Sequence, residues 1–270
     1  MIKMVWHLLS RKPSIEITGY EAFPLHPTFR VSTLIVDTAF WSIVFTSISL
    51  LVPVILKRGF PTYWRNLEKS KKAEFPSIII ALIHHAYVVP SAFKWIFEDF
   101  TMSDNDYLSR NCATKEALIA PFVFGYFIAD TIVYVIPQLF IGKFEMLIHH
   151  FLFFYLTLFT LFASGEINKF IPHLLVCEST GLVFNTCTIL RTVGFRGHPI
   201  VSLLENIFAL LFLVFRCIHT PIALLAMFMN FDHNSLGPAQ YTIPPICILQ
   251  WFWMYKIITI AVGKKNTKNI

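Results

Sequence analysis

Long apolar stretches constrain the fold of this chain more than any other feature. Seven stretches of about 20 residues are rich in Leu, Ile, Val and Phe and carry few charges. Backbone polar groups find no water inside a bilayer, so stretches of this kind fold as membrane-spanning α-helices. We expect these helices at 31–56, 75–97, 117–141, 146–164, 170–191, 201–230 and 243–262.

The composition excludes a soluble protein and a nucleic-acid partner. Hydrophobic residues make up 56% of the chain and charged residues only 14%, too few to cover a surface that faces water. The formal charge of +6 could suggest a nucleic-acid-binding protein. Most Lys and Arg residues, however, flank the apolar stretches and form no basic stripe with interleaved aromatic residues, which is the pattern of membrane topology.

The same basic residues predict an orientation in the membrane. Loop 57–74 contains six Lys and Arg residues, and the side of the membrane to which it belongs collects twelve against seven on the other side. Because short cytosolic loops are enriched in Lys and Arg, we expect a lumenal N-terminal segment at 1–30 and a membrane domain at 31–262. A cytosolic basic tail follows at 263–270.

Several polar side chains lie deep in the apolar stretches. The charged ones are Asp130, Glu178 and Arg216, and such residues are costly in a bilayer unless they pair or line a cavity. At about 1.5 Å per residue, the polar positions fall between the cytosolic interface and the midplane and beyond, which predicts a polar cavity open to the cytosol. For Arg216 an ion pair with Glu178 or Asp130 is the simpler interpretation. Uncharged polar side chains in the same stretches are His84, His85, Asn185, His219 and Gln250.

The tetrapeptide Leu-Ile-His-His occurs twice, at 82–85 and at 147–150, without a longer repeat around it. Adjacent histidines point about 100° apart on a helix, so a pair seldom supplies two ligands to one metal, and we expect no metal site. His149 and His150 lie near the cytosolic end of the fourth stretch and are the candidates for chemistry. His84 and His85 lie deeper, where we expect them to line the cavity beside the buried acids.

Five short motifs on successive stretches resemble one known family. They are FGYFIAD (124–130), MLIHH (146–150), LLVCEST (174–180) followed by Asn185, FLVFR (212–216) and ILQWFWM (248–254). Their order and spacing resemble the TLC (TRAM/LAG1/CLN8) domain family, which includes ceramide synthases, translocating-chain-associated membrane proteins and the lipofuscinosis protein CLN8. The likeness is greatest to the small TMEM56-like and CLN8-like members. The chain lacks the paired aspartates that follow the histidine pair in ceramide synthases, so we do not expect that sphingolipid activity.

The resemblance implies an all-α membrane protein of the endoplasmic reticulum, with about seven helices around a lipid-accessible cavity and a role in lipid homeostasis. Two functions stay open: transfer of an acyl group from acyl-CoA to a lipid amine or hydroxyl, and non-catalytic sensing or organisation of lipids or binding of cargo. A transporter or proton-coupled channel is a third, weaker alternative.

Under the first function the chain binds no cofactor, acyl-CoA is a co-substrate, and membrane lipids and a second copy of the chain in a homodimer are candidate partners. The expected catalytic residues are His149, His150, Asp130 and Glu178, and the expected substrate-binding residues are His84, His85, Asn185, Arg216 and Gln250.

Overall fold

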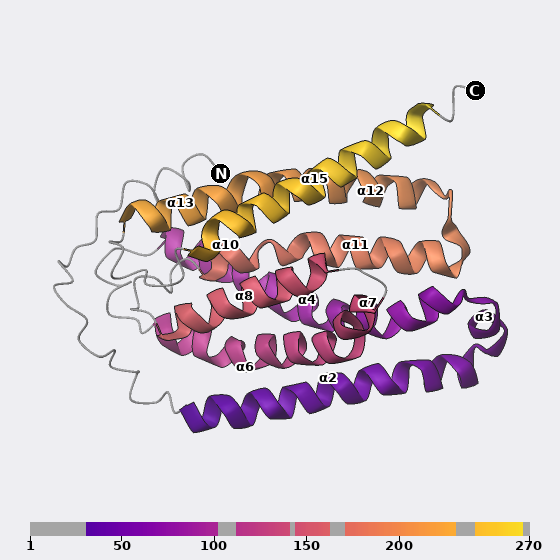
Figure 1. The fold of residues 1–270 in the computed structure, drawn as a ribbon, viewed down its shortest axis with the longest axis horizontal. Helices are drawn as coiled ribbons and strands as arrows, with labels where there is room; N and C mark the ends of the chain where they lie inside the picture. The colour runs from indigo at the N-terminus through magenta and orange to yellow at the C-terminus, as the bar shows by residue number, and fades with distance from the viewer. Residues whose placement is uncertain (1–30, 102–111, 141–143, 163–170, 231–240, 267–270) are drawn as a thin grey trace.

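The computed structural model describes residues 31–101, 112–140, 144–162, 171–230 and 241–266, and all regular structure within these ranges is helical (Figure 1). The elements are α2 (Val31–Gly59), α3 (Pro61–Asn66), α4 (Lys69–Thr101), α6 (Cys112–Asp130), η1 (Thr131–Val135), α7 (Ile136–Leu139), α8 (Glu145–Phe162), α10 (Ile171–Leu175), α11 (Glu178–Leu190), η2 (Arg191–Phe195), α12 (Pro199–Leu211), η3 (Phe212–His219), α13 (Thr220–Asn230) and α15 (Ile243–Asn266).

The predicted all-α membrane architecture is confirmed. Among the described residues, six helical segments are long and apolar enough to cross a bilayer, and each matches one of the predicted stretches. The remaining stretch, expected at 146–164, is helix α8, whose described apolar part at Glu145–Leu156 is shorter than the other six. Helices α2, α4, α6, α11, α12 and α15 run along the same long direction of the molecule (Figure 1).

The segment expected to be a loop at 57–74 is mostly helical. Helix α2 continues to Gly59, and the short helix α3 follows with Pro61 in its first turn. Helix α4 then begins at Lys69, several residues before the predicted start at 75. Lys and Arg are good helix formers, and a proline in the first helical turn loses no hydrogen bond, so the charged segment continues the helices instead of interrupting them.

The outer helices present apolar side chains to the surroundings. Helix α2 packs along α6, and Gly125 allows the close approach because a Cβ at this position would collide with the Cβ of Trp41. The other face of α2 exposes large side chains such as Phe40 and Leu50, and α15 exposes Trp251 and Tyr255. In water this would be an apolar patch, whereas in a bilayer it is the surface that contacts lipid.

Helices α4, α6 and α11 are the most buried spans: α4 packs against α2, α6 and α11, α6 also packs against α2 and α8, and α11 packs against α12. Two wider π-helical segments interrupt regular α-helix next to buried charges: η1 begins directly after Asp130, and η3 contains Arg216. Such segments shift the direction of the side chains that follow, and they occur frequently at functional sites. They therefore mark the part of the bundle where the buried polar groups gather.

Candidate functional site

A cavity of about 750 Å³ lies between α4, α6, α8, α11, α12 and α15. Its size falls within the ordinary range for small-molecule sites, and its walls are mainly apolar with a few polar groups. Of the nine predicted site residues, seven line it: His85, Asp130, His149, His150, Glu178, Asn185 and Arg216. The other two, His84 and Gln250, are buried next to lining residues but do not line the cavity themselves.

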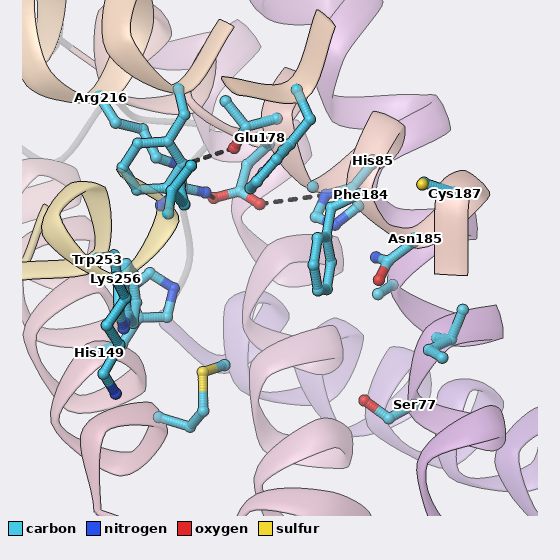
Figure 2. A pocket seen from close by; sticks show the side chains of 18 of the residues that line it. Ser77, His85, His149, Glu178, Phe184, Asn185, Cys187, Arg216, Trp253 and Lys256 are labelled. Carbon is cyan, nitrogen blue, oxygen red and sulfur yellow. Dashed lines mark hydrogen bonds and ion pairs between the residues drawn. The ribbon is translucent and has the colours of Figure 1, made fainter. Parts of the chain in front are cut away.

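One wall of the cavity carries a chain of charged and polar contacts from α4 through α11 to η3 (Figure 2). His85 Nδ1 lies 3.1 Å from Glu178 Oε2, and Arg216 Nη2 lies 3.8 Å from Glu178 Oε1. The Arg216 Nε donates a hydrogen bond of 2.7 Å to Thr180 Oγ1. The predicted pairing of Arg216 with a buried acid is therefore confirmed, with Glu178 as the partner. Gln250 completes the contacts of Arg216 by accepting a 3.3 Å hydrogen bond from Nη1.

The histidines of α4 are tightly enclosed. The ring of His85 lies directly against Gly181, where any Cβ would overlap its Nε2. The ring of His84 stacks on Tyr126, with centroids 4.1 Å apart and planes 15° apart, and neither of its nitrogens has a hydrogen-bond partner. Together with Glu178 they are a group of three that could hold a metal ion, since one ligand atom from each lies within 4.8 Å of the other two.

The histidines of α8 differ from each other in their contacts. His150 Nε2 lies 3.4 Å from Asp130 Oδ2, and its Nδ1 lies 2.9 Å from the hydroxyl of Thr131 at the start of η1. Asp130 is held in turn by Ser77, which donates a 2.5 Å hydrogen bond to its Oδ1. Both nitrogens of His150 are therefore engaged, and a buried carboxylate fixes the direction of its ring.

His149, in contrast, keeps a ring nitrogen without a partner. Its ring packs against Phe153 and Trp253, with centroid distances of 4.6 and 5.1 Å, and its buried Nδ1 makes no hydrogen bond. In Figure 2 the ring lies beside Trp253 and Lys256, on the side of the cavity away from His85. An imidazole that lines the cavity and has a ring nitrogen without a hydrogen-bond partner is a candidate base or nucleophile.

Two ion pairs lie at the rim of the cavity, one between α15 and α8 and the other between η2 and α12. Lys256 contacts Glu145 at 2.9 Å, and Arg191 contacts Glu205. All four side chains are about one-third to one-half exposed. With Arg216, each basic residue that lines the cavity thus has an acidic partner in the described part of the chain.

Four residues of the site were not predicted from the sequence. Ser77 and Thr131 hold the Asp130–His150 pair, Thr180 accepts from Arg216, and Trp253 covers His149. Serine and threonine in helices often bond their own backbone, so nothing in the sequence separates Ser77 or Thr131 from the others, whereas Thr180 ends the LLVCEST motif. Trp253 lies in the ILQWFWM motif, which could have indicated it.

Comparisons with known proteins agree with the motifs. The family model described as TLC domain matches residues 74–259. The chain is 23% identical over 224 residues to TLC domain-containing protein 4 A of Dictyostelium discoideum, an alignment that covers 79% of this chain and 84% of that protein. No solved structure matches the chain. The matched region contains every residue that lines the cavity except Ala261 and Ile260.

Proposed function

The chain belongs to the TLC domain family of membrane proteins, and from that premise we propose that it transfers an acyl group from acyl-CoA to a lipid amine or hydroxyl. The observation that carries the proposal is His149, which lines a largely apolar cavity, has a buried Nδ1 without a hydrogen-bond partner, and lies next to a histidine that a carboxylate orients. The size and apolar lining of the cavity suit an acyl chain, and its polar groups suit the reacting centre.

His149 acts as the general base in this proposal. The acceptor gives its proton to a ring nitrogen of His149 while its oxygen or nitrogen attacks the carbonyl carbon of the thioester. The carbon–sulfur bond then breaks, and coenzyme A leaves with the proton from His149. The same nitrogen could instead take the acyl group first and pass it to the acceptor, which divides one difficult step into two.

The neighbouring groups orient the reactants. Asp130 and Thr131 engage both nitrogens of His150 and fix its ring beside His149 in the wall of the cavity. Asn185 and Arg216 also line the cavity and supply polar contacts that hold the acceptor against His149. The rim pairs Lys256–Glu145 and Arg191–Glu205 are partly exposed, so CoA phosphates can compete with the carboxylates for the two cations.

The second candidate is non-catalytic binding or organisation of membrane lipids. The observation that favours it is that Arg191, Arg216 and Lys256, the basic residues lining the cavity, each already pair with an acid. Basic residues that are already paired with acids can hold the helices of the bundle together instead of taking part in a reaction.

Lipid analysis of cells that lack or overproduce the protein separates the two functions. Under acyl transfer, overproduction changes one acylated lipid class, and His149→Gln lowers its formation by at least about 100-fold. His173→Gln is the matched control, because His173 is equally buried but does not line the cavity. A lipid change that His149→Gln and His150→Gln leave at full size would reject acyl transfer and support lipid organisation.

The proposal includes a location and an orientation. We place the protein in the endoplasmic reticulum, with a lumenal N-terminus and a cytosolic C-terminus, so that soluble acyl-CoA reaches the rim from the cytosol. Engineered glycosylation sites at each end test the orientation. Modification at the N-terminal site alone is expected, and modification at the C-terminal site would contradict the route for acyl-CoA.

A further inference from the structure

The wall opposite His149 contains a cluster that the proposed acyl transfer does not explain. His84 and His85 of α4 and Glu178 of α11 are 1%, 5% and 8% exposed. One ligand atom from each residue lies within 4.8 Å of the other two, and no other group of three His, Cys, Asp or Glu in the described part of the chain meets this condition. Two imidazoles of α4 and a carboxylate of α11 are thus gathered at one point.

The cluster leaves nitrogen atoms without hydrogen-bond partners. Both ring nitrogens of His84 are buried and make no hydrogen bond. A buried polar atom without a partner is unfavourable, and such cases in a folded protein call for an explanation, such as a bound ion. The lone pair of a neutral imidazole is also the donor that zinc and iron prefer.

We propose that His84, His85 and Glu178 bind a divalent first-row transition metal ion, zinc or iron(II), with an open coordination position toward the cavity. Two histidines and one carboxylate form the ligand set of several catalytic zinc sites and of non-haem iron sites. Because His85 and Glu178 line the cavity, a water molecule or a substrate oxygen can reach the remaining position.

The local geometry suits such an ion. With metal–ligand distances of about 2.0–2.1 Å, neighbouring ligand atoms in a tetrahedral site are about 3.3 Å apart. The distance of 3.1 Å between His85 Nδ1 and Glu178 Oε2 is close to this value. Oε1 of the same carboxylate faces Arg216 at 3.8 Å, so one oxygen serves the metal and the other keeps the ion pair.

The objection from sequence, that adjacent histidines diverge, does not hold here. The rings of His84 and His85 are 5.3 Å apart, and both lie close enough to Glu178 to share one ion. Tyr126 supports one ring by stacking, and Gly181 leaves room for the other. Glu178 and an anionic fourth ligand, hydroxide or a carboxylate, offset two of the three positive charges of the metal and Arg216.

The metal content of the purified protein tests the proposal directly. The full chain, carrying an affinity tag without histidine, is purified in detergent without chelators, and zinc and iron are measured by mass spectrometry. About one ion per chain is expected, and the measurement identifies which metal it is. A monodisperse wild-type protein that contains neither metal, as purified and after incubation with each followed by dialysis, overturns the proposal.

Variants assign the ion to this cluster. Loss of a supporting residue outside the ligand set costs about 10–100-fold in metal affinity, so His84→Asn and Glu178→Gln are expected to cost more than about 100-fold. His173→Asn and His219→Asn are matched controls, because these buried histidines contact each other at 3.2 Å outside the cluster, and they keep the metal. Equal metal in all four variants overturns the proposal.

A measurement on the wild type alone covers the case in which the ligand variants fail to fold. Cobalt(II) added to metal-free wild-type protein is expected to give the visible absorption bands of a low-coordinate nitrogen and oxygen site and to raise the unfolding temperature. Absence of both effects overturns the proposal. None of these readouts depends on acyl transfer, so the metal site and the proposed function fail or hold separately.

Discussion

The two Leu-Ile-His-His segments have identical residues and opposite surroundings. The first pair, His84 and His85, is packed against a glycine and an aromatic ring and faces Glu178. In the second pair, His150 is fixed by Asp130, but His149 lines the cavity and has a buried ring nitrogen without a hydrogen-bond partner. The helices that face each pair, and not the pair itself, therefore decide what it can do.

The two histidine pairs also differ in how much stability is lost when one of their residues is replaced. The first pair belongs to a network in which Glu178 links a histidine and a buried arginine, and removal of one charge leaves the other without a partner. In the second pair, His149 has only packing contacts, so its replacement removes chemistry at little cost in stability. We expect variants around the first pair to lose stability and variants of His149 to lose activity.

Arg216→Met should have the largest effect on stability. It removes the cation that faces Glu178 and the donor to Thr180 and Gln250. Breaking a buried pair from one side costs about 3–5 kcal/mol, measured as the change in unfolding free energy in detergent. The double variant with Glu178→Gln should recover part of the loss, because no buried charge is then left alone. A loss below about 1 kcal/mol would show that the network around the first pair is not a stabilising unit.

Ser77→Ala should have the next largest effect and concerns the second pair. Its hydroxyl donates to Asp130, and a hydrogen bond to a charged group contributes about 1.5–3 kcal/mol. Because Asp130 orients His150, we also expect lower activity. Ser91→Ala is the matched control on the same helix, since the Ser91 hydroxyl is exposed and bonds only the carbonyl oxygen of Tyr87. Equal losses in both variants would show that the Asp130–His150 pair does not depend on Ser77.

Most of the fold could be predicted from the sequence, because apolar length and the positions of Lys and Arg are properties of the chain alone. All seven apolar stretches correspond to helices, and the largest boundary errors lie in the charged segment 57–74, where helix propensity continues beyond the apolar residues. The buried charges also predicted the cavity, since a charge in a bilayer must pair or contact water.

The site was only partly predictable, because contacts between helices depend on the direction of each side chain. Counting residues along ideal helices predicted that Arg216 pairs with Glu178 or Asp130, and the structure identifies Glu178 as the partner. It could not show that η1 brings Thr131 to His150, because a π-helical segment changes the register of the residues that follow. It also did not show that His84 turns toward Tyr126 rather than into the cavity, because packing of its ring selects that direction.

Gly181→Ala tests how tightly the first pair is enclosed. The new methyl group would overlap the ring of His85, and the ring must move away from Glu178. Overpacking of this kind costs about 1–3 kcal/mol. Gly59→Ala is the control, since no atom lies within 4 Å of the added Cβ there, and its effect should stay within about 0.5 kcal/mol. If Gly181→Ala has the same unfolding free energy as the wild type, the space around His85 is larger than in the structure. The first histidine pair is then not more tightly enclosed than His149.

Lys256→Gln should have the smallest effect on stability. It tests whether a residue at the rim of the cavity has a different role from the two histidine pairs. Lys256 and Glu145 are 46% and 35% exposed, and pairs of this kind contribute about 0–1 kcal/mol because water and salt screen them. Its effect on the reaction is expected to be larger: if Lys256 binds a phosphate of acyl-CoA, the KM for acyl-CoA rises while kcat is unchanged, because the contact is made equally in the ground state and the transition state. Lys94→Gln is the matched control, since Lys94 is 71% exposed on α4 and pairs with Glu98 away from the cavity. A fall in kcat with KM unchanged would place Lys256 with the second pair at the reacting centre rather than at the rim.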